Sequence, residues 1–190
     1  LENKLGLVHH RFKRGYRNVI NESIRLNKEG MESCLAIETS GHGALKENYF
    51  LDDGAYMSVK ILCEVVRCKR AGKSIEDMLN GLKEPADTKE IRINITLENF
   101  KEYGFKVLED FKTYAQSDNR FHIVEPNYEG VRISFDDNEV QGWMLIRMSL
   151  HDPILPMNIE TNEVGGVEII LERLRPFFAP YDNLENPLIR

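Results

Sequence analysis

Apolar and polar positions in the first part of the chain alternate between strand spacing and helical spacing. Residues 5–8 form a short strand-like run. Residues 15–28 carry apolar side chains every three or four positions, which predicts an amphipathic helix. Residues 33–39 are a continuous apolar run that is typical of a strand buried on both faces. The pattern therefore predicts strand, helix and strand in succession.

A longer helix is expected after this second strand. Asp52 or Asp53 can cap its start, and the basic residues and glycine near residue 72 are suited to its end. A short helix is expected from Ser74. Because strands and helices alternate, the spacing predicts an α/β domain over residues 1–84.

The second half of the chain has a different pattern, and a polar stretch with a proline, residues 82–89, is expected to link the two halves. The expected elements are, in order, a strand at 90–96, a helix at 98–116, strands at 130–136, 142–149 and 154–161, and a helix at 166–178. Grouped strands with two helices predict an α+β domain with a mainly antiparallel sheet over residues 85–190. Residues 179–190 are expected to form a loose tail.

Charge is distributed unevenly between the halves. Residues 1–84 contain 14 Lys/Arg and 12 Asp/Glu (+2), and residues 85–190 contain 11 and 19 (−8), which sum to the net charge of −6. An acidic chain without a basic stripe is a poor candidate for nucleic acid, whereas a few local cations suffice for a small anion. The sequence contains no apolar run of membrane-spanning length, so no membrane partner is expected.

Three cysteines without short-spaced pairs argue against a disulfide framework. Cys34 in the apolar run and Cys63 on an apolar helix face are expected to be core thiols, which favours a reduced, cytoplasmic location. The chain begins at Leu1 rather than Met, which suggests a piece of a longer protein.

A compact polar cluster follows the second predicted strand. Within five positions it contains Glu38, Ser40, Gly41 and His42. In open α/β sheets, ligands bind beyond the carboxyl ends of strands. Glu38 can accept two hydrogen bonds from a sugar diol, Ser40 can donate and accept, and Gly41 permits an unusual backbone shape. The alternative is a polar loop with a solvated glutamate.

Two further segments are suited to an anion. Arg147 and Ser149 lie two residues apart on a predicted strand that turns at Pro153, and arginine offers a planar fork to phosphate oxygens. An exposed Arg–Asp pair is the alternative there. Residues 9–16 form a basic patch beside a glycine, and the alternative is a solvated basic loop.

Three motifs in one order resemble the C-terminal half of the α-D-phosphohexomutases, most closely the phosphomannomutase/phosphoglucomutase type. They are Lys-x-Gly at 13–15, Glu-x-Ser-Gly-His at 38–42, and Arg-x-Ser at 147–149 before a proline turn. The resemblance implies that residues 1–84 are most or all of the third domain, an α/β fold. It implies that residues 85–190 are the fourth domain, a TATA-binding-protein-like α+β fold.

The resemblance also implies roles for individual residues of the first half. Glu38 and Ser40 would contact the sugar hydroxyls. His42 would lie close to the reacting end, and Lys13 matches the active-site lysine of the third domain. One departure concerns Tyr16, which follows Gly15 where many members have a histidine.

In the second half, the resemblance implies that Arg147 and Ser149 grip the phosphate that is not being transferred. His151 stands where a threonine is expected, with Asp152 after it, and could replace the hydroxyl donor at the phosphate. It could equally turn outward.

The implied activity of the parent enzyme is interconversion of hexose 1-phosphate and hexose 6-phosphate through a bisphosphate, on mannose and glucose. Such an enzyme uses Mg²⁺ and a glucose 1,6-bisphosphate-type activator. The phosphoserine of the first domain and the Mg²⁺ loop of the second have no counterpart in this sequence, so the chain alone is expected to be inactive. The alternatives are a non-catalytic sugar-phosphate or anion-binding module, and a mutase that acts on glucosamine phosphate.

Overall fold

The computed structural model describes residues 5–186 of the 190-residue chain. The chain divides into two compact units, Leu1–Lys83 and Glu84–Arg190, and each is described by itself. Among the described residues, no helix combines the length and the apolar character that crossing a membrane requires.

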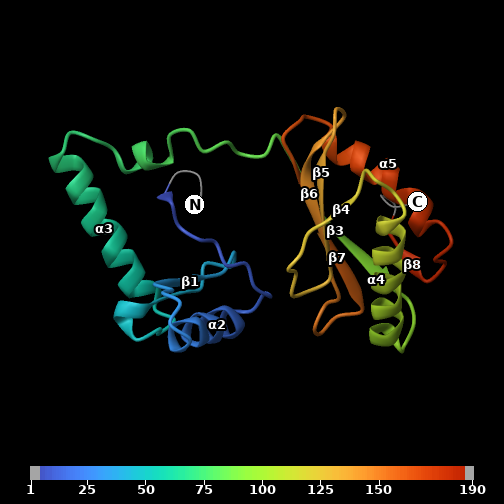
Figure 1. Cartoon of the computed structure of the whole chain (residues 1–190), viewed down its shortest axis with the longest axis horizontal. Coiled ribbons are helices and arrows are strands. Elements are labelled where there is room, and N and C mark those ends of the chain that lie inside the picture. The colour runs from blue at the N-terminus through green and yellow to red at the C-terminus, as the bar shows by residue number, and fades with distance from the viewer. Residues whose placement is uncertain (1–4, 187–190) are drawn as a thin grey trace. The chain divides into compact units, whose positions relative to one another are not determined.

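The described elements of unit 1 include the α-helices α2 and α3 and one β-hairpin (Figure 1). Its elements are α2 (Tyr16–Lys28), β1 (Leu35–Ile37), β2 (Gly43–Leu45), the 3-10 turn η1 (Lys46–Asn48), α3 (Gly54–Arg70) and the 3-10 turn η2 (Ile75–Leu79). The strands β1 and β2 pair antiparallel, and α2 lies beside them. The two longer helices expected here are thus confirmed, and the short helix expected from Ser74 is the 3-10 turn η2. Asp53 rather than Asp52 caps α3, because its side chain accepts the Tyr56 N–H.

The apolar positions of unit 1 are buried less than their pattern predicts. The buried apolar side chains among its described residues are Leu26, Ala36 and Ala44. The expectation that Cys34 and Cys63 are core thiols is wrong, because both are exposed. Cys34 precedes β1, which has one neighbouring strand and is therefore not covered on both faces, and Cys63 lies on α3, none of whose residues is buried.

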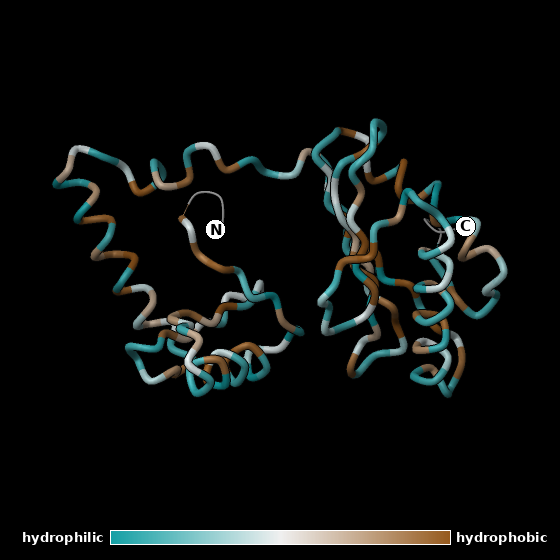
Figure 2. Tube along the Cα trace, viewed as in Figure 1, coloured by the Kyte–Doolittle hydropathy of each residue, from teal (hydrophilic) through white to brown (hydrophobic). Residues whose placement is uncertain are grey.

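Helix α3 shows the same discrepancy. It has the expected amphipathic pattern, with hydrophobic positions visible along its length in Figure 2, yet none of its residues is buried. Residues 5–8 are not a strand either, since Leu5 is helical and residues 6–13 have no regular structure. Local spacing therefore predicted the helices of unit 1 correctly but not their packing.

Unit 2 is a six-stranded antiparallel sheet with two helices on one face (Figure 1). Its elements are β3 (Asp87–Ile95), α4 (Phe100–Gln116), β4 (His122–Ile123), β5 (Val131–Asp136), β6 (Gln141–Ile146), β7 (Ile154–Thr161), α5 (Gly166–Phe178) and β8 (Leu184–Glu185). The strands run in the order β4-β5-β6-β7-β3-β8. The sequence-based prediction of an α+β unit with a mainly antiparallel sheet is confirmed.

The core of unit 2 lies between the sheet and the two helices. Alternate strand residues such as Ile91, Ile93 and Ile133 point into it, and Phe111 from α4 and Leu174 from α5 close it from the other side. The opposite face of the sheet is polar and aromatic. There, the guanidinium carbon of Arg132 lies 3.9 Å from the centre of the Trp143 ring. Regular burial on one face explains why period-two spacing predicted these strands well.

Two short strands of unit 2 were not expected. The segment after α5 was predicted as a loose tail, but β8 pairs with β3 there and Leu184 is 1% exposed. Strand β4 pairs with β5 and was likewise missed. The predicted linker is also shorter, because β3 already begins at Asp87. Two-residue strands carry too little periodicity to be identified from sequence, and they form because they pair with an edge strand of the sheet.

A buried arginine joins α5 to the turn between β5 and β6. Arg173 is 5% exposed at its side chain and donates to Asp137 Oδ2 at 2.7 Å and to Glu139 Oε2 at 2.6 Å. The Arg173 guanidinium, with the amides of Glu139 and Val140, holds the pKa of the Asp137 carboxyl well below its usual value, against the opposing effect of burial. The network fixes this turn to the helix.

Candidate functional site

The 38–42 cluster forms the turn of the β1–β2 hairpin. Gly41 N–H donates to Glu38 O and Glu38 N–H donates to His42 O, both at 2.9 Å, which closes the turn. Gly41 has a φ of 89°, a conformation that glycine adopts without strain. The expectation that this loop leaves a buried strand toward a helix is corrected, since an antiparallel strand, β2, follows it first.

Glu38 is the centre of this turn. Its Oε1 accepts the backbone N–H of Gly15 at 3.2 Å, and its Oε2 accepts the Ser40 hydroxyl at 3.0 Å. Glu38 is half-buried, whereas Ser40 is exposed. An ionised carboxylate has about four acceptor positions, so both oxygens can still accept hydrogen bonds from a ligand. The turn therefore presents a carboxylate and a hydroxyl side by side.

The basic segment 9–16 is brought to the same place by its backbone. Contact with Glu38 is made by Gly15 N–H, not by Lys13, whose ammonium lies 5.8 Å from the Phe12 ring centre. The predicted Lys-x-Gly and Glu-x-Ser motifs thus adjoin each other in the structure.

A buried carboxylate anchors this segment to α2. His10 Nε2 lies 2.9 Å from Glu22 Oε1, and Arg25 donates to both Glu22 oxygens at 2.8 and 2.9 Å. Arg25, together with His10, lowers the pKa of the Glu22 carboxyl to about 2, although burial acts in the opposite direction. The anchor holds the 9–16 segment against the helix that follows it.

His42 is held by Asp52 at one edge and by Tyr16 at one face. Its Nδ1 lies 2.7 Å from Asp52 Oδ2, and Asp52 Oδ1 accepts the Gly43 N–H at 3.2 Å. The rings of Tyr16 and His42 are stacked, with 4.8 Å between their centres. The His42 side chain remains 49% exposed, so the imidazole is restrained but accessible.

Sequence reasoning missed Asp52, which it treated as a possible helix cap. Two consecutive residues with left-handed backbone, Tyr49 (φ 54°) and Phe50 (φ 57°), turn the chain so that Asp52 bridges back to Ala44. Asp53 then caps the helix. The pair of adjacent aspartates could have indicated this, because one aspartate suffices to cap the helix and the other can then bind a different group.

The other predicted site residues lie in unit 2, on the loop between β6 and β7. Arg147 is half-buried, with its Nε atom buried, and its backbone N–H donates to Pro156 O at 3.1 Å. The Ser149 hydroxyl accepts the Asp152 N–H at 3.2 Å, which fixes the turn, and His151 is exposed.

A glycine sets the position of the Arg147 backbone. Gly130, which precedes β5, has a φ of 59°. A Cβ placed on it would lie 2.0 Å from Ile146 O and 2.8 Å from Arg147 Cα. Because both neighbours are backbone atoms, no side-chain movement could relieve the contact. Glycine at this position therefore permits the close approach of the two loops.

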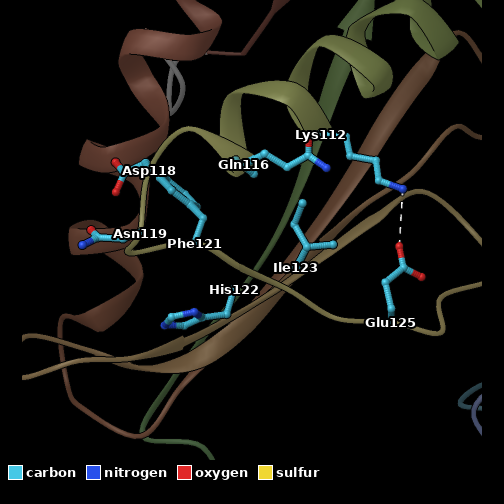
Figure 3. Close-up of a pocket in the computed structure, with 9 residues that line it drawn as sticks. Lys112, Gln116, Asp118, Asn119, Phe121, His122, Ile123 and Glu125 are labelled. Atoms are coloured by element: carbon cyan, nitrogen blue, oxygen red, sulfur yellow. Dashed lines mark hydrogen bonds and ion pairs between the residues drawn. The ribbon is translucent and has the colours of Figure 1, made fainter.

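A separate open hollow lies at the C-terminal end of α4 (Figure 3). It has a volume of about 620 Å³ and is lined by Lys112, Ala115, Gln116, Asp118, Asn119, Phe121, His122, Ile123 and Glu125. Its charged residues already have partners, since Lys112 lies 3.3 Å from Glu125 and Arg120 lies 2.6 Å from Asp118. None of the predicted site residues lines it.

Metal ligands are not grouped in the described part of the chain. Among residues 5–186, no three His, Cys, Asp or Glu side chains are gathered in a way that could hold a metal ion. The described residues therefore do not fit the Mg²⁺ site that the resemblance assigns to the parent enzyme.

Comparison with known proteins found a family model that matches the first unit and a crystal structure with a similar fold. Residues 2–85 match the family model "Phosphoglucomutase/phosphomannomutase, alpha/beta/alpha domain III". A crystal structure of a phosphoglucomutase/phosphomannomutase family protein from Burkholderia thailandensis has a similar fold, with a TM-score of 0.66 and 23% sequence identity. The match covers 91% of the present chain and 33% of that protein.

A search of the curated proteins found no match to the chain. The similar fold extends over both units, whereas the match to the family model lies in the first. The family model agrees with the sequence-based resemblance to the phosphohexomutases over residues 2–85, and the crystal structure shows a similar fold.

Proposed function

We propose that this chain supplies the substrate recognition of a phosphohexomutase, an enzyme that interconverts hexose 1-phosphate and hexose 6-phosphate through a bisphosphate. In this proposal the hairpin turn of unit 1 binds the sugar hydroxyls. The β6–β7 loop of unit 2 binds the phosphate that is not transferred. The substrate class is mannose and glucose phosphates.

The observation that carries the proposal is the arrangement around Glu38. Within the segment that matches domain III, the Glu38 carboxylate and the Ser40 hydroxyl lie 3.0 Å apart, and the Gly15 amide donates to the carboxylate. A carboxylate accepts hydrogen bonds, and a hydroxyl both donates and accepts. Two adjacent hydroxyls of a hexose match this pair.

The same pair suits a substrate that must turn over in the site. When a hexose bisphosphate reverses, its O3 and O4 hydroxyls exchange places, and a carboxylate–hydroxyl pair can hold the diol in either orientation. Mannose and glucose differ at C2 only, so a site that contacts O3 and O4 accepts both. His42, restrained by Asp52, would face the reacting end of the sugar and exchange a proton through Nε2.

Phosphate recognition is assigned to Arg147, Ser149 and His151. A charge-assisted hydrogen bond from arginine to phosphate is worth about 1.5–3 kcal/mol. The Ser149 hydroxyl accepts the Asp152 amide, so its own proton is free to be donated to a phosphate oxygen. The exposed His151 could add a further donor. Lys13 would contribute positive charge near the sugar.

The chain is proposed to recognise substrate without transferring phosphate. Mg²⁺ and the phosphoserine would be supplied by the other domains of the parent enzyme. A bisphosphate activator would likewise act on that parent enzyme. Phosphoryl transfer depends on such positioned cations and on a phosphoryl donor.

Titration of the 190-residue chain tests the proposal. Glucose 6-phosphate, mannose 6-phosphate, glucosamine 6-phosphate and inorganic phosphate are added at one pH, and binding is followed by amide chemical shifts. The variants are Glu38→Gln and Arg147→Ala. The matched controls are Glu32→Gln, whose side chain is 83% exposed, and Arg92→Ala, whose side chain is 71% exposed.

Arg147→Ala is expected to weaken the binding of all four ligands by about 10- to 100-fold. Glu38→Gln is expected to weaken the binding of the hexose phosphates by about tenfold and to leave the affinity for inorganic phosphate unchanged. Equal affinity for phosphate and hexose phosphates would identify an anion-binding module instead. Preference for glucosamine 6-phosphate would identify the other mutase type.

A further inference from the structure

Tyr16 connects the 9–16 segment to the hairpin turn of unit 1. It is the first residue of α2, and its ring stacks on His42 with 4.8 Å between ring centres and 25° between the ring planes. The Tyr16 hydroxyl accepts a hydrogen bond from Arg17 Nε at 3.1 Å. The guanidinium carbon of Arg17 lies 5.7 Å from the centre of the Tyr16 ring.

Two contacts restrain different degrees of freedom of the His42 ring. Asp52 binds Nδ1, so it favours the tautomer with a proton on Nδ1 and leaves Nε2 as the nitrogen available to a ligand. A single hydrogen bond at one edge still allows the ring plane to tilt. The Tyr16 ring lies against one face and limits that tilt.

We propose that Tyr16 is a positioning residue for His42, so that Nε2 is presented to the sugar phosphate in one orientation. This rests on the proposed function, because it assumes that His42 faces a bound hexose phosphate. Tyr16 itself does not touch the reacting atoms. Its effect passes through the orientation of the imidazole.

The chemistry of the pair supports this role. The flat face of a phenol ring can pack against a planar imidazole, which limits how far the imidazole plane can tilt. Arg17 restrains the phenol by binding its oxygen. With tyrosine at this position, the described site has one imidazole, His42, at the hairpin turn and a rigid aromatic surface beside it.

The stack can be tested without any ligand. In proton–carbon spectra of the full 190-residue chain, the ring protons of His42 are expected upfield of those of the exposed His151, because they lie over the Tyr16 ring. The His42 signals are assigned by their loss in His42→Gln. Tyr16→Leu is expected to move them downfield, whereas Tyr16→Phe keeps them in place.

Tyr128→Leu serves as the matched control, because Tyr128 is exposed and belongs to unit 2. Amide signals of both units report whether each variant remains folded, and those of unit 1 decide for the Tyr16 variants. If the His42 signals coincide with those of His151 in the wild type, or do not respond to Tyr16→Leu, the stack is absent and the inference is overturned.

Affinity for glucose 6-phosphate separates positioning from a purely structural contact. Tyr16→Leu is expected to weaken binding by about 2- to 10-fold, the value of one aromatic pair, and Tyr16→Phe to restore it. Unchanged affinity in Tyr16→Leu would overturn the positioning role even if the stack exists. If the wild type binds no hexose phosphate, the proposed function fails, and the ligand-free spectra still decide whether the stack is real.

Discussion

Replacing Gly130 by alanine is the sharpest test of how unit 2 positions its phosphate loop. The added Cβ would lie 2.0 Å from Ile146 O and 2.8 Å from Arg147 Cα, and neither backbone atom can yield without moving β6. The left-handed φ of 59° costs about 1–2 kcal/mol for an alanine. Separating the strand ends adds the loss of one or two backbone hydrogen bonds, at about 1 kcal/mol each. The expected destabilisation is therefore about 2–4 kcal/mol.

Gly165→Ala is the matched control. Its φ of 82° is also left-handed, but nothing lies within 4 Å of a Cβ placed there, so only the conformational cost of about 1–2 kcal/mol remains. Urea unfolding followed by the fluorescence of Trp143, the chain's one tryptophan, measures both variants. Gly130→Ala should in addition weaken phosphate binding through Arg147. Equal destabilisation by the two variants would refute the close-approach argument.

Three further predictions concern stability. Arg173→Met should lower the free energy of unfolding by about 3 kcal/mol, which is the lower end for a broken buried ion pair because both partner carboxylates are partly exposed. Arg175→Met on the same helix should lower it by under about 1 kcal/mol in the same urea assay. Because the folded-state pKa of the Asp137 carboxyl lies below its unfolded value, its stabilisation is complete above about pH 4 and is lost as the pH falls further. Unfolding free energies measured between neutral and acid pH should therefore fall more steeply in the wild type than in Arg173→Met, and parallel curves would contradict this account. Asp53→Ala should destabilise α3 by about 1 kcal/mol through loss of its cap, seen as reduced helicity by far-UV circular dichroism, and unchanged helicity would argue against the cap.

The success of pattern-based prediction differs between the two units for a physical reason. In unit 2, helices and strands share one large core, so each apolar position, such as Ile91 or Leu174, is where its period predicts. In unit 1 the same kinds of pattern predicted burial that the described structure does not contain. Cys63 is exposed and no residue of α3 is buried, because the two-stranded hairpin offers too little surface to cover this helix.

The candidate site was partly predictable. Glu38, Ser40 and His42 were singled out because three functional groups within five residues are close in any conformation. The partners that orient them could not be found in this way. Gly15 contributes a backbone amide, Tyr16 a ring face, and Asp52 a carboxylate ten positions after the histidine it holds.

The sequence by itself determined the helices and the four longer strands of unit 2 with their core positions, the polar turn and the family resemblance, because local spacing and short motifs encode these directly. Tertiary structure decided which of two adjacent aspartates caps α3 and which holds His42, since the left-handed turn at Tyr49 and Phe50 brings Asp52 back to the hairpin. It also decided that Gly130 must lack a side chain, because only the folded sheet brings the Arg147 backbone against it. Contacts between distant segments depend on the path of the chain in space, and periodicity carries no information about that path.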